Sequence, residues 1–243
     1  MATLNIDAKD MHFKDLNAKI RTARQHNITI DNCMGQRYIG AALSHKEIFI
    51  NGLPGNAIGA YLDGSTIVVN GSTQEATGDT MNEGKIIIHG NAGDATGYAM
   101  RGGKIFVQGN SGYRTGIHMK EYEDKIPVVV IGGRVGSFLG EYQAGGVIIV
   151  LGIGQNGELP VGYFTGTGMH GGKIFLRSDY EPVGLPPQVI CRLAEQKDKE
   201  DIWANVAEFC EYFGGNPTEL LAKQFYVLMP NTKNPYKQLY VNN

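Results

Sequence analysis

Short, mostly apolar triplets recur along the middle of this 243-residue chain, and in the four most regular copies a polar residue and a glycine follow the triplet. The triplets begin at Ile28, Ile48, Ile67, Ile86, Ile105, Val128, Ile148 and Ile174. From Ile48 to Ile105 the spacing is nineteen residues each time. A fixed period of this kind is the sequence signature of a repeat architecture.

The period predicts the fold class. Nineteen residues are too few for a helix and a strand with their connections, but they suffice for one coil of three short strands and tight turns. We therefore expect an all-β solenoid, a right-handed parallel β-helix of about eight coils. The predicted segments are an N-terminal cap (1–27), the β-helix (28–178) and a helical C-terminal segment with an extended tail (179–243).

Glycine is the unusual component, with 34 residues. Tight turns need residues that tolerate positive φ, so we assign glycines of the repeats to the turns. These are Gly52, Gly59, Gly71, Gly78, Gly90, Gly93, Gly97, Gly109 and Gly116. Gly152, Gly154 and Gly157 match a dinucleotide-binding fingerprint, but Pro160 follows where that site needs a helix, which favours a widened turn.

The alternation within each triplet predicts two faces. Since side chains alternate along a strand, the first and third residues point into the β-helix and the middle residue points outward. The outward positions are apolar too, at Phe49, Val68, Ile87, Phe106 and Val129. An apolar column of this length must be covered by the C-terminal segment, by another subunit, or by both. Arg114 and His118, grouped in one turn region, complete the predicted interface.

The segments before and after the repeats are each predicted to contain helices. Phe13–Gln25 reads as a short amphipathic cap, and a helix with Asp198 as its N-cap ends at Gly214. A second helix begins at Asn216. The tail carries aromatic residues at Phe225, Tyr226, Tyr236 and Tyr240, so we expect it to dock on a surface.

Candidate chemistry is sparse. The formal net charge of −2 gives no support for a nucleic-acid partner, and no apolar run is long enough for a membrane span. Cys33, Cys191 and Cys210 form no disulfide framework, which favours buried thiols and a cytoplasmic location. The histidines show no metal-ligand spacing, and the carboxylates of Glu121–Lys125 read as a solvated loop. We expect no catalytic, cofactor-binding or metal-binding residue in this chain.

The repeats resemble a known family. The stretches GNAGDATGYAMRGGKIFVQGNSGYRTG, GEYQAGGVIIVLG and GMHGGKIFLR are similar to the C-terminal domain of the glutamate synthase large subunit, named for its glycine repeats. Gly90, Gly93 and Gly97 carry the clearest G-x-x-G-x-x-x-G repeat. PPQV and NPYKQLYV resemble the stand-alone form of that domain. One of the subunits of formylmethanofuran dehydrogenase shares the repeats.

The resemblance implies a non-catalytic scaffold. In a glutamate synthase-type oxidoreductase such a subunit braces a glutaminase subunit and an FMN-binding synthase subunit, and the FMN and the iron–sulfur cluster belong to those partners. A homo-oligomer is left open. The alternatives are a scaffold like the repeat-bearing subunit of formylmethanofuran dehydrogenase and a free-standing polysaccharide-acting β-helix enzyme. The last needs charged residues recurring on an outer face, where this chain has apolar ones.

Overall fold

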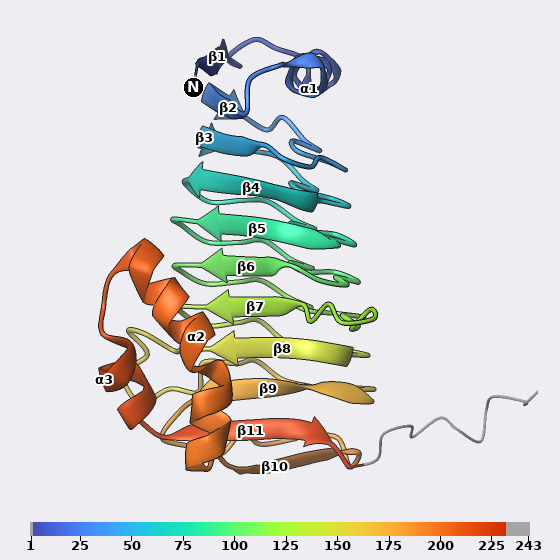
Figure 1. The fold of residues 1–243 in the computed structure, drawn as a ribbon. Helices are drawn as coiled ribbons and strands as arrows, with labels where there is room; N and C mark the ends of the chain where they lie inside the picture. Colours follow the sequence, from blue (N-terminus) through green and yellow to red (C-terminus); the bar gives the residue numbers. More distant parts are fainter. Residues whose placement is uncertain (1, 232–243) are drawn as a thin grey trace, which may run out of the picture.

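The computed structural model describes residues 2–231, in which one eleven-stranded sheet runs the length of the molecule (Figure 1). The strands are β1 (Thr3–Asp7), β2 (Asn27–Met34), β3 (Glu47–Leu53), β4 (Asp63–Asn70), β5 (Glu83–Ile88), β6 (Lys104–Val107), β7 (Val128–Ile131), β8 (Ala144–Val150), β9 (Gly171–Arg177), β10 (Val189–Leu193) and β11 (Phe225–Pro230). The helices are α1 (Phe13–Thr22), α2 (Gln196–Phe213) and α3 (Pro217–Ala222).

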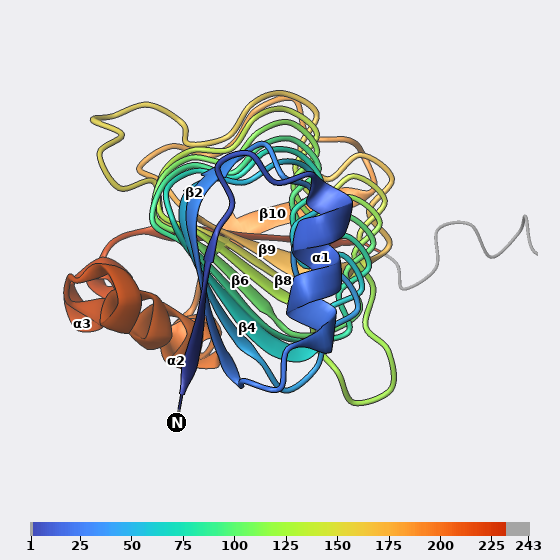
Figure 2. The ribbon, with the colours of Figure 1, turned by 90° about the horizontal axis from the view of Figure 1, so that it is seen from above.

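The sheet is largely parallel. Strands β1 to β9 pair in chain order, each parallel to the next, so the chain returns behind the sheet after every strand (Figure 2). β11 then joins β9 antiparallel, and β10 pairs antiparallel with β11 at the end of the sheet. The repeat and its strand positions are thus confirmed, in a mostly β fold.

One detail of the predicted repeat is wrong. Each repeat forms one strand rather than three. The segments that return behind the sheet are joined from layer to layer by isolated bridges, such as Ala92 with Ser111 and Ser111 with Val135. Residues with positive φ interrupt these segments, for example Ala95 (φ 54°) and Ala99 (φ 49°). Because a ladder needs consecutive extended residues, these turns keep further strands from forming.

The interior of the stack is a continuous aliphatic column. Ile48 pairs with Ile67, and Ile86 pairs with Ile105, in the predicted register. A second column also lies in the core and contains Leu62, Met81, Met100, Met119 and Met169, all fully buried. Gln143 takes the corresponding place in one layer, where its amide nitrogen donates to the carbonyl oxygens of Gly145 and Gly146. The methionine side chains of this column therefore serve packing.

The register of β7 corrects the assignment of faces in that layer. Ile105 pairs with Val129, and Phe106 pairs with Val130. Val129 therefore points into the core and Val130 takes the outer place predicted for Val129. The connection from β6 to β7 is one residue longer than the triplet pattern indicates, and a shift of one residue exchanges the two faces of a strand.

The two ends of the stack are closed differently. α1 lies at the N-terminal end with Leu16 and Ile20 buried, and it ends at Thr22 rather than at Gln25 (Figure 1). β1, which the sequence analysis did not predict, pairs with β2 at the same end. At the other end β11 begins at Phe225, which confirms an extended segment there. Tyr236 and Tyr240 of the predicted docking tail lie outside the described residues.

The repeat glycines serve the backbone in two ways. Positive φ occurs at Gly52, Gly59, Gly71, Gly78, Gly97 and Gly116, as predicted. Gly90, Gly93 and Gly109 have no positive φ, so the turn argument is wrong for them. A Cβ at Gly93 would lie 2.7 Å from the carbonyl carbon of Gln74 in the preceding layer. At these three positions glycine permits close approach of two backbones.

Candidate interaction surfaces

The apolar outer column is covered over most of its length by α2. The pairing places Val68, Ile87, Phe106, Val130, Ile149 and Phe175 in one row across the strands. Ile202, Val206 and Phe209 of α2 pack with this row in a second buried cluster, separate from the interior one. Figure 2 shows α2 and α3 outside the sheet, on the face opposite the returning loops. Cover by the C-terminal segment is thus confirmed.

The start of α2 differs from the prediction. Its N-cap is Glu195, and Asp198 lies at the third helical position, where both residues form a reciprocal capping box. Asp198 also forms an ion pair with Arg192 of β10, with Nη1 to Oδ2 at 2.6 Å and Nη2 to Oδ1 at 3.0 Å. The hydrogen bonds from Arg192 lower the pKa of Asp198. This pair fixes the beginning of α2 to the end of the sheet.

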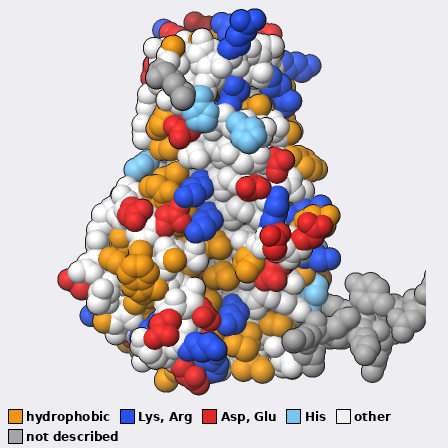
Figure 3. Space-filling view, viewed as in Figure 1, with side chains coloured by type: hydrophobic (Ala, Val, Ile, Leu, Met, Phe, Trp, Pro, Cys, Tyr) orange, Lys and Arg blue, Asp and Glu red, His pale blue; other side chains and the backbone are white. Residues whose placement is uncertain are grey.

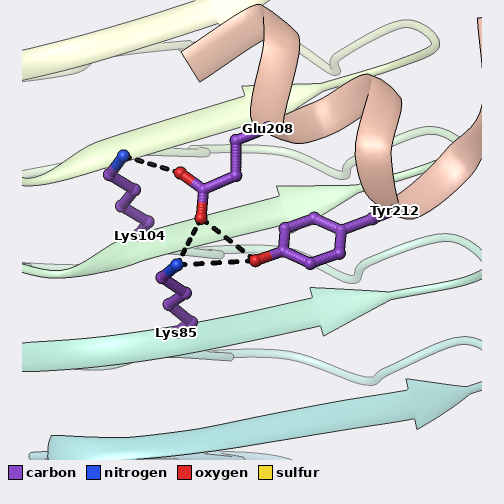
Figure 4. A network of polar contacts seen from close by, with 4 residues as sticks. All are labelled: Lys85, Lys104, Glu208 and Tyr212. Atoms are coloured by element: carbon purple, nitrogen blue, oxygen red, sulfur yellow. Dashed lines mark hydrogen bonds and ion pairs between the residues drawn. The ribbon is translucent and has the colours of Figure 1, made fainter. Parts of the chain in front are cut away.

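A polar network fixes the middle of α2 to the sheet (Figure 4). The carboxylate of Glu208 accepts from Lys85 Nζ at 2.5 Å and from Lys104 Nζ at 2.7 Å. The hydroxyl of Tyr212 donates to the same carboxylate at 3.0 Å. Lys85 and Lys104 are paired neighbours on β5 and β6, so a single carboxylate bridges two strands. Burial acts to raise the pKa of Glu208, but the two lysines outweigh it and the pKa lies below its ordinary value.

Sequence reasoning missed this network, although a signal was present. Lys85 and Lys104 occupy the same place in consecutive repeats, directly before the apolar triplet. Glu208 and Tyr212 lie four residues apart, and residues at that spacing share one face of a helix. The pattern could have predicted a carboxylate facing the lysine pair, but it could not place the helix against those two strands.

α2 does not extend over the outer column in the N-terminal layers of the stack. Phe49 is 37% exposed and Val68 is half-buried, whereas Ile87 is buried and Phe106 is fully buried. Phe106 packs edge-on to Tyr212 of α2, with ring centroids 5.3 Å apart. Ile87 and Phe106 therefore cannot contact another protein while α2 is docked. We call the exposed Phe49 and the half-buried Val68 the open end of the column. Figure 3 shows hydrophobic side chains exposed beside charged ones on this face.

Arg114 and His118 lie in a separate aromatic cluster on the turns, away from the outer column. Arg114 Nε donates to Glu141 Oε2 at 2.7 Å. Its guanidinium also lies over the ring of Tyr113, 4.8 Å from the centroid, and within 5.6 Å of that of Phe138. His118 stacks on Tyr142, with centroids 5.2 Å apart and ring planes 8° from parallel. The structure thus separates the predicted interface residues into two surfaces.

The aromatic cluster continues into the next layer and is strained. Phe138 contacts Phe164, whose side chain is 54% exposed, and the adjacent Tyr163 is 75% exposed. Arg114, His118, Phe138, Tyr142 and Phe164 all have positive φ. At the same places the earlier layers have both small and large residues, namely Tyr38, Ala42, Ala57, Tyr61, Ala76, Thr80, Ala95 and Ala99. The left-handed region costs an L-residue about 1–2 kcal/mol, so the backbone alone does not favour large side chains here.

The described residues offer little for cofactor or metal chemistry. Across 2–231 no group of three or more His, Cys, Asp and Glu side chains could hold a metal ion. The cysteines are free thiols, and burial raises the pKa of Cys33 and of Cys191 to about 11. In the same part of the chain, none of the helices has the length and apolar character that crossing a bilayer requires. What the surface does offer is aromatic and aliphatic contact area.

Comparison with known proteins gives the family. The GXGXG motif family matches residues 5–233 of the chain. The chain belongs to the GXGXG family. The match begins within β1 and includes all later strands, α2 and α3, so the family pattern includes the helical segment as well as the repeats.

Two further comparisons give proteins that are similar to this member of the GXGXG family. Over 253 aligned positions the chain is 42% identical to Uncharacterized protein MJ1350 of Methanocaldococcus jannaschii, with 99% of this chain and 97% of that protein covered. A chain in the crystal structure of the formyltransferase/hydrolase complex (FhcABCD) from Methylorubrum extorquens, determined with methylofuran, has a similar fold. The TM-score is 0.67 at 21% sequence identity, and 92% of each chain is covered. At that identity the likeness shows the fold.

Proposed function

We propose that this chain is a non-catalytic scaffold subunit of a multi-chain enzyme, in an assembly of the formyltransferase/hydrolase and formylmethanofuran dehydrogenase type. The observation that carries the proposal is the fold shared with a chain of FhcABCD over 92% of both chains. The described residues add support, because their surface offers contact area and no cluster of metal-binding side chains. In this role the chain binds no flavin, iron or nicotinamide cofactor of its own.

The finer description of the fold belongs to the same proposal. A strand followed by a crossover to a parallel neighbour in the same sheet is right-handed in nearly all proteins. Eight such crossovers link β1 to β9, since each consecutive pair is parallel. We therefore describe 28–178 as a right-handed parallel β-helix of about eight coils, with 1–27 as its cap and 179–243 as a segment that covers one face.

Two surfaces are assigned to partner subunits. The first is the open end of the outer column, at Phe49 and Val68, where the cover by α2 stops. The second is the aromatic cluster around Arg114 and His118, which combines exposed tyrosine and phenylalanine rings with an arginine held by Glu141. Aromatic residues and arginine are enriched in protein interfaces, and side chains that are already ordered lose less entropy on binding.

A glutamate synthase-type assembly is the second candidate. It is favoured by the repeat stretches, including Gly90, Gly93 and Gly97, which resemble the C-terminal domain of that enzyme's large subunit. In this case the partners are a glutaminase subunit and an FMN-binding subunit. The structural likeness to FhcABCD supports the first candidate more strongly, because it covers 92% of this chain.

The test is purification of the tagged full-length chain from its native source, followed by identification of the subunits that stay bound through size exclusion. Subunits that resemble formyltransferase/hydrolase components support the first candidate, and a glutaminase with a flavoprotein supports the second. A chain that elutes alone as a monomer contradicts both. Phe49→Asp should reduce partner capture, whereas Val183→Asp, at an apolar residue that is 74% exposed on the loop between β9 and β10, should not.

A further inference from the structure

Two adjoining cavities open where the helical segment meets the coils, and Arg177 and Lys223 line both of them. The larger has a volume of about 430 Å³ and the smaller about 160 Å³. Small-molecule sites begin at about 300 Å³, so the larger cavity has the size of a ligand site. It lies apart from the open end and from the aromatic cluster, and the inference does not depend on which assembly the chain joins.

One wall of the larger cavity is apolar. Phe209 and Phe213 of α2, Leu220 of α3 and Ile153 after β8 line it. The rings of Phe209 and Phe213 are edge to face with centroids 4.8 Å apart, which fixes the orientation of both. These residues come from segments that are distant in the sequence, so the cavity exists only when α2 and α3 are docked on the coils. The wall suits the apolar body of a small molecule.

Two cations, Arg177 and Lys223, also line the larger cavity. Arg177, the last residue of β9, donates from Nε to the carbonyl oxygen of Leu151 and from Nη2 to that of Gly152 at 3.0 Å. These bonds hold the half-buried guanidinium in place and leave further N–H groups for a ligand. Within residues 2–231, neither Arg177 nor Lys223 forms an ion pair with a carboxylate.

The balance of charge favours an anion in the larger cavity. Its one lining carboxylate, Glu219, lies beside the side-chain amide of Asn216, at 3.5 Å. The smaller cavity is instead lined by Glu158 and Asp179 in addition to the two cations. Burial lowers the pKa of Arg177, which shows that its charge is partly removed from water. Asp179 acts in the opposite direction on that pKa, but it lines the smaller cavity, so on the side of the larger cavity the guanidinium can still gain stability when an anion binds.

We propose that the larger cavity binds a small organic anion, with an apolar or aromatic body between Phe209, Phe213 and Leu220 and an anionic group against Arg177 and Lys223. The anionic group is a carboxylate, phosphate or sulfonate, since each accepts hydrogen bonds from a guanidinium.

The test uses two fluorescent probes of similar shape. 8-Anilinonaphthalene-1-sulfonate carries an anionic group on an aromatic body, and N-phenyl-1-naphthylamine has the same kind of body without the charge. The full-length protein should bind the sulfonate at one saturable site. Arg177→Gln should weaken that binding about tenfold or more and leave the uncharged probe unaffected, because only the charge-assisted contact is lost. Ile153→Trp should weaken both probes by filling the cavity.

Lys125→Gln is the matched control, because it removes a cation that pairs with Glu83 away from the cavity. Melting temperatures of all variants establish that they are folded. The proposal is wrong if the protein binds no sulfonate probe, if Lys125→Gln weakens binding as much as Arg177→Gln, or if Arg177→Gln weakens both probes equally. Competition of the sulfonate by benzoate or by phenyl phosphate then identifies which anionic group the site prefers.

Discussion

Lys85 and Glu208 lie 123 positions apart in the sequence and meet at 2.5 Å, one on the fifth strand of the sheet and the other on the helix that covers it. Lys104 holds the second oxygen of the same carboxylate at 2.7 Å. The contact fixes the position of α2 along the apolar column, because an apolar surface by itself allows a helix to slide. The first prediction concerns this carboxylate.

Glu208→Gln should lower the free energy of unfolding by about 1–3 kcal/mol at neutral pH, since it removes charge-assisted bonds to both lysines from a mostly buried group. The folded-state pKa of Glu208 lies below its ordinary value of 4.5. The stability from this carboxylate is therefore present above that pH and is lost as the pH falls through and below it. Urea unfolding of both proteins from about pH 7 to about pH 3 measures the effect. A gap between wild type and variant that does not narrow in acid would contradict the assignment.

The outer column offers a matched pair of substitutions. Phe106→Asp should lower the free energy of unfolding by at least about 3 kcal/mol, because it places a carboxylate under α2 in place of a fully buried ring. Phe49→Asp makes the same change in the same column beyond the end of α2, and should cost no more than about 1 kcal/mol. Chemical unfolding of the two variants gives the comparison. Equal losses would mean that α2 does not cover the column in solution.

Gly97 tests the turn geometry. It has φ 73°, and a Cβ there would lie 3.1 Å from Cγ2 of Val129 in the core. Gly97→Val should cost about 2–3 kcal/mol, from backbone strain together with crowding. Gly154→Val is the control, since Gly154 has φ 82° with no atom within 4 Å of the added Cβ, and should cost only about 1–2 kcal/mol from strain. An unchanged melting temperature for Gly97→Val would show that the turn is wrong.

The thiols give a fourth prediction. Burial raises the pKa of Cys33 and Cys191 to about 11 and raises that of Cys210 as well. At about pH 8 the thiolate fraction of the first two is then on the order of one in a thousand, so the folded protein should react very slowly with Ellman's reagent. All three should react rapidly in denaturant. Rapid reaction of one thiol in the folded protein would identify an accessible thiolate and contradict this account.

The repeat could be read directly from the sequence, because every layer obeys the same local rule. The spacing correctly predicts that four isoleucines pair in register, namely Ile48, Ile67, Ile86 and Ile105. The outward-facing middle residues of the triplets are also apolar, which predicts that another segment covers them, and α2 is that segment. Where one layer departs from the spacing, the local rule fails. Val129 was assigned to the outer face because the extra residue before β7 has no signature in the apolar pattern.

What the sequence by itself determined is therefore the stack: its period, its aliphatic interior, its turn glycines with positive φ, and the apolar outer face. Only the tertiary structure decided how far α2 covers that face, which leaves Phe49 open and buries Phe106. It also decided that Glu208 bridges Lys85 and Lys104, that Arg114 and His118 join an aromatic cluster, and that Arg177 lines a cavity with Phe213. The physical reason is the sequence separation of the residues that make the deciding contacts. Strand register and turns follow from neighbouring residues and a fixed repeat, whereas the position of a helix on a uniform apolar surface depends on contacts between residues that are far apart in the chain.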